Sequence, residues 1–145
     1  GNTINIDGTG VISTVSVAKV KQLVKNATGS PLLKGQAVYV NGANGTNVTI
    51  ALAQANAEST SSKTLGLLEA DIANGGTGYV VTEGVLTGLN TNAATNEGDP
   101  VWLSPTVAGG LVYGVANKPL APWKESLRVP SVVLNSGSSF SALTI

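Results

Sequence analysis

The sequence contains no histidine and no cysteine. Without histidine it lacks the commonest general base and the commonest imidazole metal ligand. Without cysteine it has no disulfide, no thiol nucleophile and no thiolate metal site. An enzyme could still use paired carboxylates, but the lack of both histidine and cysteine favours a protein that is not an enzyme. We therefore predict no catalytic residue, no cofactor and no metal.

Charge is also scarce. Charged residues make up 11% of the chain, against about 25% in ordinary soluble proteins. Eight basic and eight acidic residues give a formal net charge of zero, so we predict no nucleic acid partner and no anionic membrane partner. No apolar run reaches the ~18 to 20 residues of a membrane-spanning helix. A neutral, weakly charged surface offers little repulsion between copies, which favours self-association.

The first 22 residues form a candidate arm. Ile4 and Ile6 precede an Asp-Gly turn at Asp7, and Val15 and Val17 follow it. Apolar residues that alternate on both sides of such a turn predict a β-hairpin or an extended arm. An isolated hairpin is marginal in water, so we expect this arm to pack on its own domain or on a neighbouring copy. A flexible leader is the alternative. Residues 23–145 are predicted to form a single β domain.

Short aliphatic and β-branched runs alternate with Gly- and Asn-rich turns through that domain. They predict strands over residues 23–26, 37–40, 48–52, 65–69, 79–83 and 132–134. Residues 85–89 continue the fifth run after a kink or bulge at Gly84. The only helical candidate is "ALAQANAES", residues 51–59. Regularly spaced short strands predict an all-β fold, an antiparallel β-sandwich or barrel, with under a tenth of the residues in helix.

Two of the five Tyr and Trp residues lie in matching contexts. "GQAVYV" starts at Gly35 and "GDPVWL" starts at Gly98. In each, a turn glycine begins a strand whose valine faces one side and whose aromatic residue, Tyr39 or Trp102, faces the other. We predict core or subunit-interface packing for both aromatic residues, with ligand stacking as the alternative.

Few residues suggest a chemical site. Glu69, Asp71 and Glu83 could form a carboxylate pair or, with loop carbonyls, a Ca²⁺ site, although solvated charges at strand ends are the favoured interpretation. The glycines of "GGTGYVVTEG" lack the spacing of a phosphate-binding loop, and a hairpin loop explains them. Asn26, Asn44 and Asn47 begin glycosylation triplets. Asn- and Thr-rich loops produce such triplets by chance.

Three segments carry a resemblance to a known family. In order, they are "VKNATGSPLLKGQAVYVNGANG", "AESTSSKTLGLLEADIANGGTGYVVTEGVLTGLNT" and "GDPVWLSPTVAGGLVYGVANKPLAP". As an ordered set they resemble a module of tailed-bacteriophage structural proteins, especially tail-fibre and appendage proteins, over about Val24 to Pro122. The resemblance implies a β-rich virion protein, commonly a homotrimer, with no catalytic residues to carry over. The matching positions are Gly35, Val38, Tyr39, Gly66, Tyr79, Val80, Glu83, Gly84, Gly98, Trp102 and Leu103. After Pro122, Lys124, Glu125, Arg128 and Pro130 interrupt the Val- and Gly-rich closing strand of such modules.

The favoured hypothesis is a non-enzymatic fibre or appendage module that forms a homotrimer in the virion, assembled in the bacterial host cytoplasm. The alternative is a capsid cement protein whose arm staples neighbouring capsomers. A glycan-binding or glycan-cleaving fibre tip ranks third. The expected partners are other copies of the chain, other virion proteins of the tail, neck or capsid, and a host surface glycan as a further candidate. The candidate structural and interface residues are Ile4, Ile6, Val15, Val17, Gly35, Tyr39, Gly98, Trp102 and Trp123.

Overall fold

The computed structural model describes residues 3–6, 12–15, 19–119, 132–135 and 140–143. Strands account for 48% of the structure and helix for 7%. The all-β class and the small helical content predicted from the sequence are therefore confirmed. Within the described residues the helices are α1 (Glu58–Ser61), at the end of the Ala-rich stretch, and the 3-10 turn η1 (Val115–Asn117). No helix in this part of the chain is long and apolar enough to span a membrane.

The described strands form two sheets. The smaller sheet is a hairpin of β1 (Thr3–Ile6) and β2 (Ile12–Val15). The larger sheet has nine strands in the order β3-β5-β4-β6-β7-β10-β11-β8-β9. Its strands are β3 (Lys19–Asn26), β4 (Ala37–Asn44), β5 (Asn47–Leu52), β6 (Thr64–Leu68), β7 (Thr77–Thr87), β8 (Pro100–Leu103), β9 (Leu111–Tyr113), β10 (Val132–Asn135) and β11 (Phe140–Leu143).

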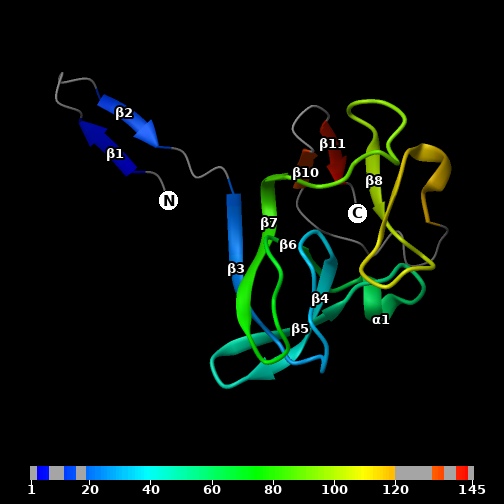
Figure 1. Cartoon of the computed structure of the whole chain (residues 1–145), viewed down its shortest axis with the longest axis horizontal. Coiled ribbons are helices and arrows are strands. Elements are labelled where there is room, and N and C mark those ends of the chain that lie inside the picture. Colours follow the sequence, from blue (N-terminus) through cyan, green and yellow to red (C-terminus); the bar gives the residue numbers. More distant parts are fainter. Residues whose placement is uncertain (1–2, 7–11, 16–18, 120–131, 136–139, 144–145) are drawn as a thin grey trace.

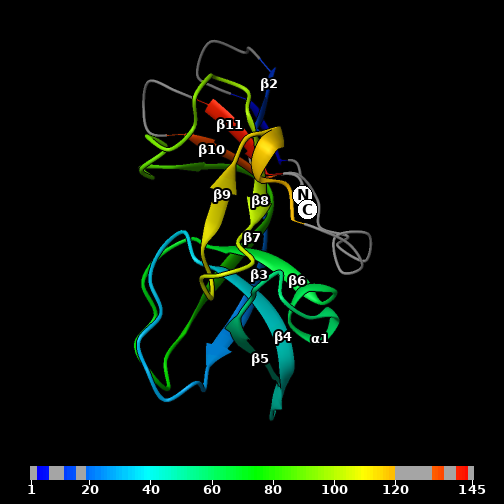
Figure 2. The same ribbon diagram turned by 90° about the vertical axis from the view of Figure 1, so that its right-hand side faces the viewer.

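The first five strands of the larger sheet close into a ring. β3 pairs with β5 over Val24–Asn26 and with β7 over Lys19–Lys25, so the order β3-β5-β4-β6-β7 returns to β3. This closed ring matches the barrel alternative. The long strand β7 then leaves the ring, because its residues from Gly84 onward pair with β10. β10, β11, β8 and β9 continue the sheet above the ring (Figures 1 and 2).

The strand directions are mixed. Most described pairs are antiparallel, as predicted, but β3–β5, β7–β10 and β8–β11 are parallel. Each parallel pair joins strands that do not follow each other in the chain. Alternating hydrophobicity shows which face of a strand is buried and carries no information about its neighbour's direction, so this correction could come only from the structure.

The apolar residues fill two cores. Every ring strand contributes one buried residue to the first core, whose buried members are Val24, Leu32, Val38, Ile50, Leu68, Ile72 and Val80. The second core lies between the ring and the C-terminal strands, and its buried members are Ala37, Ala53, Ala55, Leu67, Val81, Leu86, Val101, Leu103, Val132 and Leu134. Neighbours in the chain face opposite cores, as in Ala37-Val38, Leu67-Leu68 and Val80-Val81. Such strands are apolar on both faces, which explains why the sequence shows continuous runs there.

Several strand boundaries differ from the predicted ones. β3 begins at Lys19 instead of Leu23, because its first half pairs with β7. β7 continues through Gly84, as predicted, with a register shift at Thr82 beside it. Gly84 has a φ of 121° and pairs with both Lys19 of β3 and Val132 of β10. The predicted strand at residues 132–134 is β10. A further strand, β11, was not predicted.

Candidate functional site

The two matching motifs have matching structures. Gly35 and Gly98 lie just before strands and have φ values of 85° and 82°, in the left-handed region that favours glycine. Val38 and Val101 are fully buried, whereas the next residues, Tyr39 and Trp102, are half-buried. The predicted opposite orientation of valine and aromatic residue is therefore confirmed in both copies.

Both aromatic residues make contacts within their own chain. Tyr39 packs against the second core. The indole Nε1 of Trp102 donates a hydrogen bond to the Gly114 carbonyl at 2.9 Å, and the ammonium of Lys118 lies 5.1 Å from the ring centroid. These contacts agree with the packing role predicted for the pair. An additional role at a subunit interface stays a prediction.

The candidate residues of the arm fall on different faces of the β1–β2 hairpin. Ile4 pairs with Thr14, and Ile6 pairs with Ile12. Cross-strand partners share a face, so Ile4, Ile6 and Ile12 lie on the same side of the hairpin. Val15 pairs with Thr3 and belongs to the opposite, more polar side. Val17 and Trp123 lie outside the described residues.

The three carboxylates singled out in the sequence are not brought together as a metal site. Glu69 forms an ion pair with Lys21, whose Nζ lies 3.1 Å from Oε1 and 3.0 Å from Oε2. Asp71 accepts a hydrogen bond from the backbone N–H of Lys34 at 2.8 Å. Glu83 is exposed on β7. Over the described parts of the chain, no group of three potential metal ligands exists.

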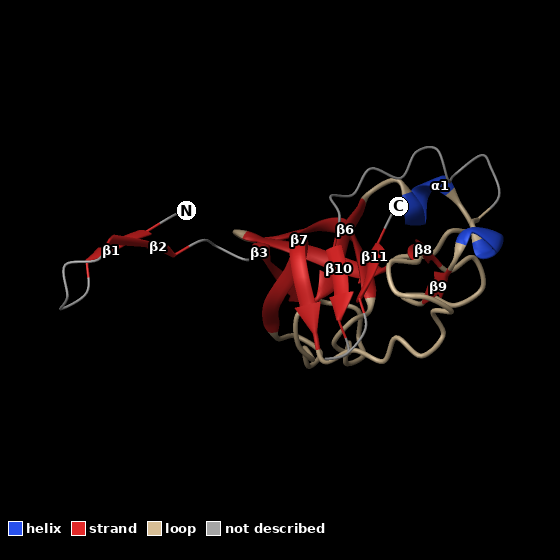
Figure 3. Ribbon diagram, turned by 90° about the horizontal axis from the view of Figure 1, so that it is seen from above, coloured by secondary structure: helices blue, strands red, loops and turns tan. Residues whose placement is uncertain are grey.

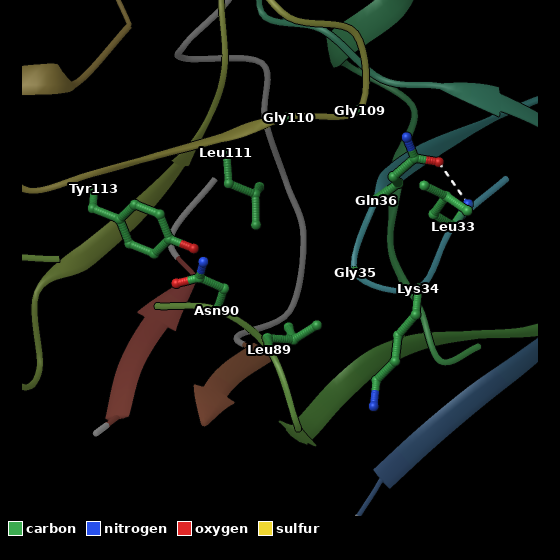
Figure 4. Close-up of a pocket in the computed structure, with 10 residues that line it drawn as sticks. All are labelled: Leu33, Lys34, Gly35, Gln36, Leu89, Asn90, Gly109, Gly110, Leu111 and Tyr113. Atoms are coloured by element: carbon green, nitrogen blue, oxygen red, sulfur yellow. Dashed lines mark hydrogen bonds between the residues drawn. The ribbon is translucent and has the colours of Figure 1, made fainter. Parts of the chain in front are cut away.

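Figure 4 shows an open hollow of about 390 Å³ between the loop before β4, the segment after β7 and strand β9. Tyr113, Asn90 and Gln36 supply its polar side chains, and Lys34 supplies a cation at the rim. Burial raises the pKa of Tyr113, so its phenol is protonated at neutral pH and offers a hydrogen-bond donor. The Gln36 amide oxygen is already occupied by the Leu33 N–H at 2.8 Å. The lining can hydrogen-bond a small polar molecule but contains no carboxylate for acid–base chemistry.

An exposed apolar surface follows the first half of β3, and the sequence analysis missed it. Leu23 and Tyr79 are cross-strand partners on the outside of the ring, 40% and 48% exposed, and Val20, on the opposite face of β3, is 54% exposed. The ammonium of Lys21 lies 5.4 Å from the Tyr79 ring centroid. In "VKQLVKN" the apolar residues are Val20, Leu23 and Val24, a spacing without the alternation that indicates a strand. The outward apolar residues of β3 could be recognised only after β7 was placed beside it.

Comparison with known proteins identifies no relative: no family model, no curated protein and no solved structure matches the chain. The interpretation of the molecule therefore depends on its own residues and geometry.

Proposed function

We propose that the chain is a non-enzymatic structural module of a tailed-bacteriophage particle that assembles as a homotrimer through its N-terminal hairpin. The observation that carries the proposal is the β1–β2 register. It places Ile4, Ile6 and Ile12 on one face of a two-stranded sheet that stands apart from the nine-stranded sheet (Figures 1 and 3). An isolated hairpin is marginal in water, and burying an isoleucine is worth roughly 1.5 to 3 kcal/mol. Docking on another copy would supply that burial.

The resemblance of the three sequence segments to tail-fibre and appendage modules supports the placement in a virion. Two further observations agree with an assembly role. The candidate carboxylates Glu69 and Asp71 are engaged in structural contacts, and the outer face of β3 and β7 exposes apolar side chains. A capsid cement protein with a stapling arm would use the same hairpin. The two roles differ in where the copies lie on the particle.

Removing residues 1–18 is the direct test, because β3 begins at Lys19 and stays intact. We expect the full chain to elute as a species of three times its 14.5 kDa mass and the shortened chain to elute as a monomer or an aggregate. The measurement is light scattering coupled to size-exclusion chromatography. Loss of the contact removes the burial that offsets the entropy of association. An unchanged trimer after the deletion would contradict the proposed role of the hairpin.

A matched pair of variants separates the apolar face from the hairpin as a whole. Ile4→Ser, Ile6→Ser and Ile12→Ser together should weaken the trimer, whereas Asn5→Ser with Ser13→Ala on the opposite face should leave it unchanged. Mass spectrometry of purified particles should then find the chain in copy numbers that are multiples of three, and a low-resolution map would place it on the tail or on the capsid. Absence of the chain from the particle would contradict the virion role.

A further inference from the structure

Strand β3 has an open edge. It pairs with β7 from Lys19 to Lys25, but it pairs with β5 only from Val24 onward. Among the described strands, none lies on the other side of Lys19–Leu23. An unpaired edge is a ready template for another strand. The Gln22 side-chain amide at this edge is exposed and donates to the Leu23 carbonyl at 3.0 Å.

Side chains at this edge would gain from a neighbour. Val20 and Leu23 are both exposed, and their odd spacing in the strand directs them to opposite faces. An added strand would therefore find one apolar side chain on each face, with Tyr79 extending the patch beside Leu23. The charged residues at the edge, Lys19 and Lys21, already share a partner in Glu69 at 4.0 and 3.0 Å.

The hairpin has the properties of the missing partner. β1 and β2 pair only with each other among the described strands, so each keeps one free edge. In the sequence, the only charged side chain of residues 1–18 is the negative Asp7. Its charge is opposite to that of Lys19 and Lys21, so the arm is attracted to this edge electrostatically. A strand that joins an existing sheet gains main-chain hydrogen bonds that a two-stranded hairpin lacks at its edges.

We propose that the β3 edge from Lys19 to Leu23 receives the β1–β2 hairpin of a second copy by strand addition. This inference depends on the proposed trimer and names the surface that accepts the arm. In Figures 1 and 3 the hairpin lies away from the β3 edge of its own chain, which favours docking between chains. In the sequence only three residues separate Val15 from Lys19, and short hinge segments favour exchange of an element between copies. Each copy then gives one hairpin and offers one edge, a head-to-tail contact that closes into a ring.

The absence of cysteine from the chain allows a clean cross-linking test. A double variant, Ser13→Cys in β2 and Gln22→Cys in β3, is treated with a bismaleimide whose spacer reaches about two strand separations, roughly 10 Å. We expect covalent dimers and trimers on a denaturing gel. A monomer that carries one internal cross-link would show docking within the chain and would overturn the inference. Absence of cross-linking would overturn it too. In the control, Ser59→Cys in the exposed helix α1 replaces Gln22→Cys, and we expect no trimers.

A second measurement tests the surface without cross-linking. Val20→Lys with Leu23→Lys should raise the concentration at which the trimer dissociates by about tenfold or more, because two exposed apolar contacts are lost. The matched control is Val107→Lys with Val115→Lys, two valines that are more exposed than Val20 and Leu23 and distant in sequence from β3. Equal effects of the two pairs would overturn the inference.

The outcomes distinguish the two proposals. If removal of residues 1–18 dissociates the trimer while the cross-link fails, the hairpin joins subunits and the β3 edge is the wrong acceptor. If the trimer survives the removal, the proposed role of the hairpin is wrong.

Discussion

Replacing Gly66 by alanine is expected to destabilise the fold strongly. Gly66 lies in β6, between β4 and β7, and a Cβ at this position would overlap the backbone carbonyl of Val81 in the neighbouring strand. It would also lie 3.1 Å from Val80 Cγ1. Backbone atoms within a sheet cannot move aside as a flexible side chain can. Because Leu67 and Leu68 of the same strand each serve one core, a displaced β6 would disturb both.

We expect Gly66→Ala to lower the free energy of unfolding by about 3 kcal/mol or more, at or above the upper end of ordinary overpacking. Domains of this size have a total stability of roughly 5 to 15 kcal/mol. Urea denaturation followed by circular dichroism measures the change. Gly42→Ala is the control, since a Cβ there meets only the Thr49 hydroxyl, at 3.2 Å. Similar losses of stability for the two variants would show that the close contact of β6 with β7 at Gly66 does not cause the destabilisation.

Replacing Asn26 by aspartate is expected to have the second largest effect. The Asn26 side chain is completely buried at the end of β3, and its hydrogen-bonding capacity is fully used. Nδ2 donates to the carbonyls of Ser30 at 2.8 Å and Ile72 at 3.0 Å. Oδ1 accepts from the N–H of Thr28 at 3.1 Å and from its hydroxyl at 2.7 Å. The side chain thereby ties the loop after β3 to the loop before β7.

Aspartate has the same shape but would direct a carboxylate oxygen at two carbonyl oxygens. Leaving buried polar groups without partners costs about 1 to 3 kcal/mol each, so we expect a loss of roughly 3 kcal/mol at pH 7. The difference from wild type should shrink near pH 4, where the introduced carboxyl is partly protonated and can donate one hydrogen bond. Thermal unfolding of both proteins at the two pH values measures this. The control is Asn44→Asp, at an exposed position, and comparable losses at both sites would refute the role of burial.

The same geometry separates the three glycosylation triplets, which look equivalent in the sequence. Asn26 is buried and hydrogen-bonded, Asn47 is half-buried, and Asn44 is exposed. At Asn26, the residues Asn-Ala-Thr form a local network in which the threonine contacts the asparagine side chain. The Asn-Ala-Thr triplet at Asn26 is therefore explained by hydrogen bonds within the fold, which the sequence alone does not show.

Much of the architecture was predictable because strand patterns are local. The paired "GQAVYV" and "GDPVWL" motifs predicted two strand starts with valine and aromatic residue on opposite faces, and both are confirmed. The turn glycines Gly35 and Gly98 have the positive φ that such turns require. Strand alternation and turn chemistry act over a few residues, which is why these features can be inferred from the chain alone.

The apolar face of the β1–β2 hairpin was only partly predictable. The apolar alternation of the first residues indicated a hairpin, and the β1–β2 pairing agrees with it. Ile4 and Ile6 share a face with Ile12 but not with Val15 because of the strand register. The turn sets that register, and it cannot be derived from the sequence pattern. Glu69 was considered for a metal or carboxylate pair, yet Lys21, far from it in the chain, lies against it in the fold.

By itself, the sequence determined the all-β class, the weak charge, and the positions of most strands, because these follow from composition and local periodicity. Tertiary structure decided which strands are neighbours, and therefore the closure of the ring, the parallel pairs and the open half-edge of β3. Strand pairing is a long-range choice between many compatible edges, settled by the joint burial of two cores. No single segment contains that information, since each strand's pattern would satisfy several partners equally well.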